Sequence, residues 1–365
     1  MGEGRVSERP DDIFQEDLDP ARARRGWGAR LGGLFRRKAT ADIPPAAPPP
    51  AGGGRRWPRL VGWGLGGLVV LFVLYMAVGA FIVHAVDDDP DFAAAAPVPN
   101  GGQATGSQAV EIAAALIERE TGGAHRWTAN DPFFLPGWLL DNMPNYQQGI
   151  IYALSRFTAE MGDQIGRSRG SSQMDPDLDR ATGLLRYPGT IWLFDLSTSW
   201  APTASSESQY RAAARALRSY NQRVAAGTAP FERRADNLLQ TIDRFAADLG
   251  SQSSVIADHI EQSRGWLIDT RADDIFYSTK GRLYAYFLVL RALGRDFEGV
   301  IAQSGATKIW DEMVENLREA AELRPLVVMN GRADAMFQPN HLAVQGFFLL
   351  RARTQMRELA NVLRN

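Results

Sequence analysis

The stretch LVGWGLGGLVVLFVLYMAVGAFIVHAV, from Leu60 to Val86, decides how this 365-residue chain is organised, because it contains no charged residue. Its apolar centre, Val61 to Val83, would cover about 34 Å as a helix, which is enough for a hydrocarbon core of about 30 Å. Arginines precede the stretch and aspartates follow it, and basic residues favour the cytoplasmic side of a membrane. We therefore predict one transmembrane helix over 60–86, with the N-terminus in the cytoplasm and the rest of the chain outside.

A cleaved signal peptide is the alternative interpretation of the same stretch. The small residues Ala93 to Ala96 resemble a cleavage site. However, 59 residues precede the stretch, and its apolar run exceeds the roughly 7–15 residues of a signal-peptide core. A signal anchor is the favoured interpretation.

Composition divides the remainder of the chain. Residues 1–59 hold twelve basic and eight acidic residues together with runs of Pro and Gly, so they predict a disordered cytoplasmic tail. Residues 87–106 are rich in Asp, Ala, Pro and Gly and predict a linker. Residues 107–365 are long enough to build a sizeable hydrophobic core and predict a periplasmic domain.

Charge and cysteine content exclude several classes of function. The part after the apolar stretch, 87–365, has 28 basic and 34 acidic residues. The net charge of −6 that results argues against a nucleic-acid partner, which would require a basic face. The chain has no cysteine, which excludes thiol catalysis, thiolate metal sites and disulfides.

Helical signals recur throughout 107–365, and we expect an all-α domain. Ser107, Asp175 and Asn340 are typical N-caps, and Leu283 to Leu290 is apolar nearly all round, as in a central helix. The expected helices cover 107–121, 146–167, a short segment after Asp175, 206–226, 231–249, 254–263, 283–290, 306–323 and 340 to the C-terminus. Residues 127–144 predict an ordered loop or short helix on the core. Ile191 to Phe194 is the best strand candidate, although so short a run fits a buried helix or a loop equally well.

Several longer stretches are similar to one bacterial family. They are LLDNMPN at 139–145, YRAAARALRSYNQRVAAG at 210–227 with FERRADNL at 231–238, the segment 277–290, and PNHL at 339–342. Together they resemble the membrane-anchored family catalogued as domain of unknown function 2333, over most of 107–363. The resemblance implies a single-pass inner-membrane protein of a Gram-negative bacterium. It implies no reaction and no catalytic residues.

The sequence indicates no metal site, no cofactor and no serine nucleophile. The four histidines are His84, His125, His259 and His341, with no HExxH motif and no two within a helical turn. SxxK does not occur, and GxSxG occurs once, at 166–170, where it ends an expected helix and lacks the strand-to-helix turn of a hydrolase nucleophile. The glycines of 62–67 lie in the apolar stretch, outside the strand and helix context of a dinucleotide-binding loop.

Acidic residues are the remaining catalytic candidates, since a glycan hydrolase needs a carboxyl group whose pKa is raised in a groove. Glu118 and Glu120 end one expected helix, and Asp273 and Asp274 precede apolar residues. Neighbouring acids on a helix point apart, so helix capping and solvation is the favoured interpretation.

The most prominent polar group is Arg233-Arg234-Ala235-Asp236-Asn237. On one helix its charges would form an exposed ion pair worth a few tenths of a kcal/mol. The alternative hypothesis is an interaction cluster with polar residues from elsewhere in the chain. That cluster would consist of Arg233, Arg234, Asp236, Asn237, Asn142, Asn145 and Asp273.

Gly62 and Gly66 form a GxxxG motif in the apolar stretch. Small residues at this spacing let two membrane helices approach closely, so they predict a homodimer face. Glycine is also common in membrane helices without any such role, and both interpretations stay open.

The absence of a catalytic constellation favours a non-catalytic periplasmic domain that binds an envelope protein or a cell-wall component, or serves as a scaffold. The alternative is a cell-wall glycan or peptidoglycan hydrolase that uses paired carboxylates, because one sequence cannot show which acids converge in space. A sensor or accessory subunit coupled to the cytoplasmic tail is a third hypothesis, which no kinase, GTPase or receiver motif supports.

Overall fold

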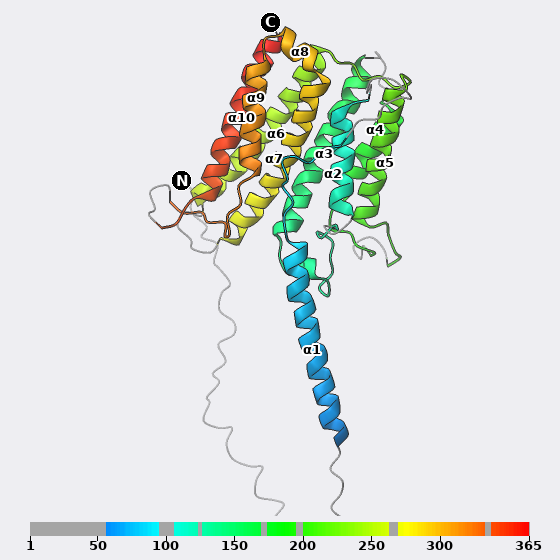
Figure 1. The fold of residues 1–365 in the computed structure, drawn as a ribbon, viewed down its shortest axis with the longest axis vertical. Helices are drawn as coiled ribbons and strands as arrows, with labels where there is room; N and C mark the ends of the chain where they lie inside the picture. The colour runs from blue at the N-terminus through cyan, green and yellow to red at the C-terminus, as the bar shows by residue number, and fades with distance from the viewer. Residues whose placement is uncertain are drawn as a thin grey trace, which may run out of the picture. The chain divides into compact units, whose positions relative to one another are not determined.

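The computed structural model describes residues 56–94, 106–122, 126–168, 174–194, 200–262, 269–332 and 337–364. Nearly all of the predicted tail, and residues 95–105 of the predicted linker, lie outside the described residues. In the described part the chain is helical and forms no β-strand, which confirms the all-α prediction (Figure 1). The helices are α1 (Arg56–Val83), α2 (Gln108–Thr121), η2 (Pro136–Trp138), α3 (Asn142–Ser168), α4 (Pro176–Leu185), α5 (Ser206–Ala225), α6 (Ala235–Gln262), α7 (Thr270–Asp296), α8 (Glu298–Gln303), α9 (Thr307–Ala321) and α10 (His341–Arg364).

Helix α1 is the predicted apolar helix. Residues Trp57–Val83 are long and apolar enough to cross a membrane, and no other helix in the described ranges meets that criterion. Most of its large side chains are exposed, as expected for a membrane-spanning helix that does not pack into a protein core.

The helix starts follow local capping chemistry. Ser107 accepts a hydrogen bond from the Val110 N–H at 3.2 Å, and Asn340 accepts one from the Ala343 N–H at 2.8 Å. The side chain of Asp175 caps α4, whose first residue is a proline. These three predicted N-caps are confirmed, because each depends only on residues within one turn.

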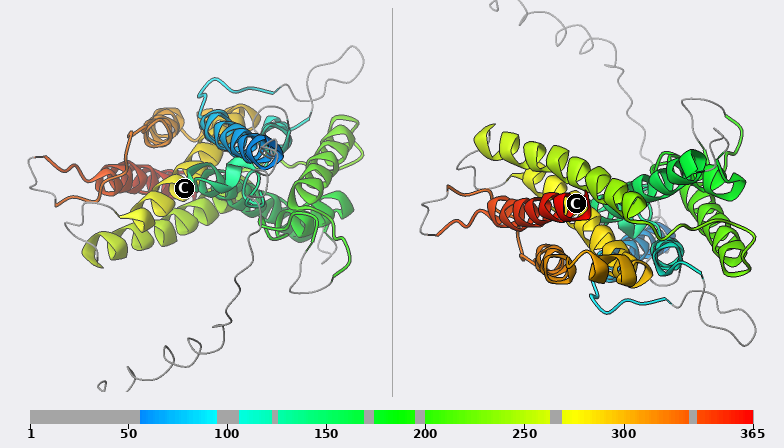
Figure 2. Two further views of the ribbon diagram at one scale, coloured as in Figure 1. Left: turned by 90° about the horizontal axis from the view of Figure 1, so that it is seen from below. Right: turned by 90° about the horizontal axis from the view of Figure 1, so that it is seen from above.

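Helix α7 is the centre of the helical bundle. It packs against α2 and α3 on one side and α9 on the other, and it also contacts α6 and α10 (Figures 1 and 2). Helices α4 and α5 pair beyond α2 and α3, and α6 pairs with α10. The segment Leu283–Leu290 of α7 is buried all round, which confirms the prediction of a central helix.

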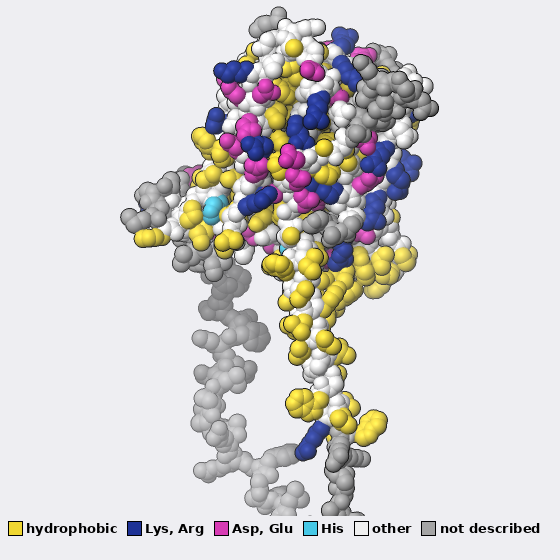
Figure 3. Space-filling view, in the orientation of Figure 1, with side chains coloured by type: hydrophobic (Ala, Val, Ile, Leu, Met, Phe, Trp, Pro, Cys, Tyr) yellow, Lys and Arg dark blue, Asp and Glu magenta, His cyan; other side chains and the backbone are white. Residues whose placement is uncertain are grey.

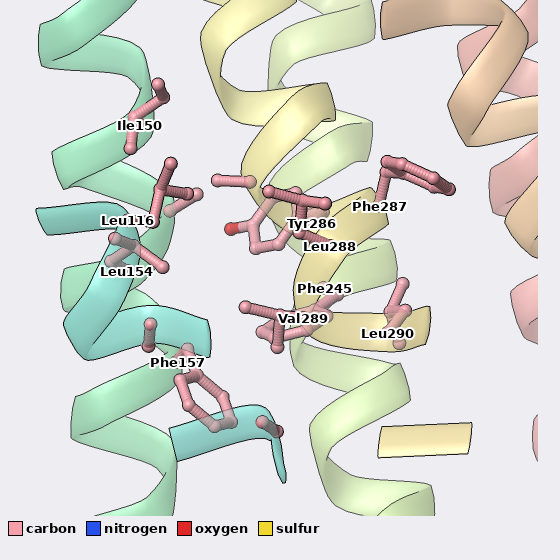
Figure 4. Close-up of a cluster of buried hydrophobic side chains, with 14 of the residues drawn as sticks. Leu116, Ile150, Leu154, Phe157, Phe245, Tyr286, Phe287, Leu288, Val289 and Leu290 are labelled. Carbon is pink, nitrogen blue, oxygen red and sulfur yellow. The ribbon is translucent and has the colours of Figure 1, made fainter. Parts of the chain in front are cut away.

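Two glycines let α3 and α7 approach closely. A Cβ atom on Gly281 of α7 would collide with the Tyr146 carbonyl of α3, and one on Gly149 of α3 would collide with the Ser278 carbonyl of α7. Around this crossing the core consists of large apolar side chains (Figure 4). The rings of Phe245 and Tyr286 are 4.4 Å apart between centroids at its centre.

Helix α6 differs from its prediction at both ends. It begins at Ala235, and the residues before it are non-helical: Phe231 packs on Phe297, and the Arg233 guanidinium stacks on Phe231. It also continues through Gly250 to Gln262, where a break was predicted. A Cβ on Gly250 would press on the Arg353 guanidinium of α10 at 2.9 Å, so this glycine serves helix packing and does not end a helix.

One further helix start needs correction, and one alternative left open by the sequence is decided. Helix α3 begins at Asn142, four residues before the start expected at 146, and the Asn145 side chain bonds to Asp274 of another helix. The strand candidate Ile191 to Phe194 is a loop with one isolated bridge to Pro202. Its Leu193 and Phe194 side chains are exposed, so it lacks the buried partner strand that an apolar strand needs.

Candidate functional site

The segment Asp87–Phe92, directly after α1, is bound by the bundle through its backbone. The Tyr146 hydroxyl donates to the Asp87 carbonyl at 2.8 Å, and the Tyr284 hydroxyl donates to the Asp89 carbonyl at 2.7 Å. Arg291 donates to the carbonyls of Pro90 and Phe92. Helices α3 and α7 thus hold a segment that sequence analysis predicted to be the start of a linker.

Asp88 is the only side chain of this segment that is fully enclosed, among the described residues. The Lys280 Nζ lies 2.5 Å from Asp88 Oδ2, and the Arg324 Nε lies 3.0 Å from the same oxygen. Lys280 also donates to the carbonyls of Ala321 and Leu323. Burial opposes ionisation of Asp88, but the hydrogen bonds and charges of Arg324 and Lys280 outweigh it and lower the pKa of that carboxyl.

Arg119 of α2 completes the contact with this segment. It donates to the Asp87 carbonyl at 3.0 Å and pairs with the buried carboxylate of Glu120 at 2.7 Å. Burial raises the pKa of Glu120, against the opposing charge of Arg119. These contacts with Asp87–Phe92 could not be predicted from the sequence, because the partners are separated by up to 236 positions in the chain.

A second polar cluster lies where α3 and α7 begin. It contains Asp141, Asn142 and Asn145 from the start of α3 and Asp273, Asp274 and Tyr277 from the first turns of α7. The Asn145 Nδ2 donates to Asp274 Oδ1 at 2.6 Å, and Asn142 bonds to the Tyr277 hydroxyl. The structure therefore brings together three of the predicted interaction residues, Asn142, Asn145 and Asp273.

The surroundings of Asp273 and Asp274 in this acidic cluster oppose their ionisation. Burial, then the charges of Asp141 and Asp274, raise the pKa of Asp273 to about 6. Burial and Asp141 also raise the pKa of Asp274, whose carboxyl is hydrogen-bonded to that of Asp141. Like charges this close oppose ionisation, so Asp273 and Asp274 lose their protons at a higher pH than isolated aspartates do.

The geometry of this acidic cluster fits neither a glycosidase carboxyl pair nor a metal site. Glycosidase carboxyl pairs stand about 5–9.5 Å apart to accommodate the sugar or a water, whereas Asp141 and Asp274 are in direct hydrogen-bond contact. In the described ranges no group of three or more His, Asp or Glu residues is arranged to hold a metal ion. The geometry thus does not favour the paired-carboxylate hydrolase at this position.

The predicted residues Arg233, Arg234, Asp236 and Asn237 lie elsewhere, at the start of α6. Arg234 Nε is 3.1 Å from Asp236 Oδ1, and both side chains are more than half exposed. Arg233 donates to the Gly106 carbonyl at 3.3 Å, and Asn237 donates to the Glu232 carbonyl at 3.0 Å. The four residues form an exposed polar edge, which we call the α6 edge.

The α6 edge borders a wide hollow of about 1130 Å³. Its other walls come from α8 and the end of α10, with both apolar and charged groups. Besides the α6 edge, the lining residues include Leu239 of α6, Val300, Gln303 and Ser304 at α8, and Val362, Leu363 and Arg364 of α10.

The structure separates the two halves of the predicted interaction cluster. Asp273 stands at the beginning of α7, whereas Arg233 acts electrostatically on Asp296 at the end of α7. Asp296 lies 23 positions after Asp273, which corresponds to a rise of about 35 Å along the helix. The α6 edge and the acidic cluster are therefore two surfaces at opposite ends of α7.

The GxxxG glycines of α1 are open. A Cβ atom on Gly62 or Gly66 would meet nothing within 4 Å. The face that was predicted to pair with a second copy is thus free of contacts with the described part of this chain.

Within the described residues, fold and site together define a helical protein with one helix suited to cross a membrane and a bundle that binds the segment following it. The chain belongs to the family described as "Uncharacterized protein conserved in bacteria (DUF2333)", whose model matches residues 81–267 and 258–365. This confirms the resemblance found in the sequence. No match was found among curated proteins. Solved structures likewise gave no match.

Proposed function

We propose that this protein is a single-pass inner-membrane protein whose helical bundle stands in the periplasm and binds an envelope protein or cell-wall component without catalysing a reaction. The observation that carries the proposal is the binding of Asp87–Phe92 by the bundle. An enzyme that searches for substrate benefits from a long flexible tether. This bundle is instead fastened within nine residues of the end of α1, a construction suited to a scaffold at a fixed height above the membrane.

Charge supports the orientation. Arg55, Arg56 and Arg59 precede the apolar helix, whereas Asp87, Asp88 and Asp89 follow it. Basic residues are retained in the cytoplasm, so this asymmetry favours a cytoplasmic N-terminus and a periplasmic bundle.

The partner surface that we propose is the α6 edge with its hollow. The exposed arginines and the mixed polar and apolar walls are typical of protein interfaces, where arginine is enriched. The acids Glu298, Asp311 and Glu315 line a second hollow, of about 580 Å³, near the end of α7. The Arg318 guanidinium lowers the pKa of Glu315, the opposite of what a general acid needs, so this hollow gives the hydrolase alternative no support.

Location and binding are tested separately. Alkaline phosphatase fused after residue 105 should be active, and the same enzyme fused after residue 50 inactive; the reverse pattern would refute the orientation. For binding, a photo-crosslinking residue replaces Arg234 in the full chain in whole cells, and the exposed Lys308 is the control position. We expect a discrete adduct from position 234 alone, and failure to form one there would refute a partner at the α6 edge.

A further inference from the structure

The loop before α3 carries an apolar surface that the proposed function does not use. From Pro132 to Leu140 the sequence reads PFFLPGWLL and contains no charge. The exposed fractions are 68% for Phe133, 60% for Trp138 and 51% for Leu140. Aromatic and aliphatic side chains this exposed are usually covered in the working molecule.

The side chain of Asp131 holds the loop together from inside. Asp131 is buried, pairs with Arg126 at 2.7 Å and accepts a hydrogen bond from the Gly137 N–H. A Cβ atom on Gly137 would collide with that carboxylate, which explains the glycine. With its polar residue turned inward, the loop presents its apolar side chains outward.

A second loop enlarges the apolar surface. Phe134 meets Trp192 edge to face, with 5.7 Å between ring centroids, and so joins the segment 191–194 to the first loop. The neighbouring side chains of Leu193, Phe194 and Trp200 are 44%, 48% and 86% exposed. Figure 3 shows hydrophobic side chains gathered at this end of the bundle. We call the described residues 132–140, 191–194 and 200–202 the apolar collar.

The position of the collar along α1 identifies what covers it. The Pro136 ring lies where a Cβ atom on Gly79 would be, so the collar contacts the penultimate turn of α1. Counted from Leu60, the first uncharged residue after Arg59, Gly79 is about 29 Å along the helix, close to the thickness of a hydrocarbon core. Trp and other aromatic side chains concentrate at that boundary.

We propose that the apolar collar inserts into the outer leaflet of the membrane that α1 crosses, so that the bundle rests on the lipid surface. This inference depends on the membrane span of the proposed function. The collar continues the exposed apolar surface of α1, where Phe81 and Ile82 are 85% and 55% exposed. A lipid surface accepts an uncharged, aromatic-rich patch of this kind without specific partners.

Site-directed spin labelling tests the insertion, and the chain suits it because it has no native cysteine. The full chain is reconstituted into vesicles of phosphatidylethanolamine and phosphatidylglycerol as Leu139→Cys, Val70→Cys or Lys308→Cys, each with a nitroxide. Val70 reports on α1, and Lys308, whose side chain is 88% exposed beyond the other end of α7, reports on water. The depth of each label follows from the ratio of its collision rate with oxygen, which concentrates in lipid, to its collision rate with a water-soluble nickel chelate.

We expect the Leu139 label to collide with oxygen several-fold more than with nickel, at a depth of about 5–10 Å below the headgroups. A Leu139 label as open to nickel as the Lys308 label, with the Val70 label in lipid, would overturn the collar and leave the span intact. A Val70 label in water would overturn both. A Leu139 label that is aqueous in pure lipid and immobilised only in native membranes would mean a protein covers the collar, which also overturns the proposal.

Tryptophan fluorescence gives a second measurement without a label. In vesicles that contain brominated lipid, Trp138→Leu should remove part of the quenching seen for the full chain, because a quenched tryptophan is lost. Circular dichroism checks that the variant remains helical. Quenching that is unchanged in the folded variant would place Trp138 outside the bilayer and refute the insertion.

Discussion

The Lys280 ammonium of the central helix lies 2.5 Å from the Asp88 carboxylate, 192 positions away, and both side chains are 2% exposed. Buried ion pairs of this kind contribute little net stability while intact, but removing one partner leaves a charge in a medium that solvates it poorly. The pair therefore makes the link between α1 and the bundle sensitive to single substitutions.

Asp88→Asn should destabilise the bundle by about 3–5 kcal/mol, since it leaves the Lys280 ammonium buried without a carboxylate. Lys280→Met should cost less, because Asp88 keeps its bonds to Arg324. Denaturant unfolding of the full chain in detergent micelles, followed by circular dichroism, measures both. Equal losses for the two variants would show that Arg324 does not compensate.

The contact of α3 with α7 yields a packing prediction. Gly281→Ala places a methyl group against the Tyr146 carbonyl, which belongs to a helix backbone and cannot move alone. We expect a loss of about 1–3 kcal/mol or more in the free energy of unfolding. Gly183→Ala is the matched control: a Cβ there meets nothing within 4 Å, and alanine should gain about 0.5–1 kcal/mol in a helix interior. Similar effects at both positions would contradict the close approach of the two helices.

Local signals in the sequence predicted most of the helices, and distant contacts account for the errors. The caps Ser107, Asp175 and Asn340 act within one turn, so a single sequence reveals them. Helix α6 continues through Gly250 and packs along α10, a contact between distant parts of the chain that leaves no local trace in the sequence. The helix break predicted at Gly250 from the local sequence is therefore wrong.

The same distinction applies to the candidate sites. Residue type singled out Asn142, Asn145 and Asp273, and the structure places them together. Sequence analysis could not tell that Arg233 lies at the far end of α7, because only the fold sets that distance. It also assigned Asp88 to a linker, since nothing near Asp88 in the sequence indicates Lys280 and Arg324.

The acidic cluster makes stability depend on pH. The pKa of Asp273 is raised to about 6 in the folded chain, above the roughly 3.9 of an unfolded aspartate. Between these values the folded state binds more protons, so this group's contribution falls as pH rises from about 4 to about 6. At pH 7 the ionised group destabilises the fold.

Asp273→Asn should therefore raise the free energy of unfolding by about 1 kcal/mol more at pH 7 than at pH 4. The difference is no larger because solvent screens this half-buried group. Unfolding of both chains at the two pH values measures the difference. The exposed Asp258→Asn is the control for removing a charge. A gain of equal size at pH 4 would show that Asp273 is not held protonated there by its neighbours.

The α6 edge should contribute little to stability. Arg234 and Asp236 are 67% and 54% exposed, so replacing both by Ala should cost under about 1 kcal/mol. A loss of several kcal/mol would mean that the pair is buried in the working molecule. If the partner identified by crosslinking at position 234 no longer co-purifies with the folded double variant, the edge is a binding surface; unchanged co-purification would remove it from consideration.

The GxxxG glycines of α1 give a prediction about self-association. Because a Cβ at Gly62 or Gly66 meets nothing within 4 Å, a larger side chain there should not disturb a single chain. If this face pairs with a second copy, Gly66→Ile should weaken dimerisation by about 1–2 kcal/mol, roughly tenfold in the dissociation constant. Gly64→Ile makes the same substitution about 200° around the helix, so it should leave the dimer intact. Energy transfer between labelled full-length chains in vesicles measures the dimer fraction, and equal losses from Gly66→Ile and Gly64→Ile would refute pairing through this face.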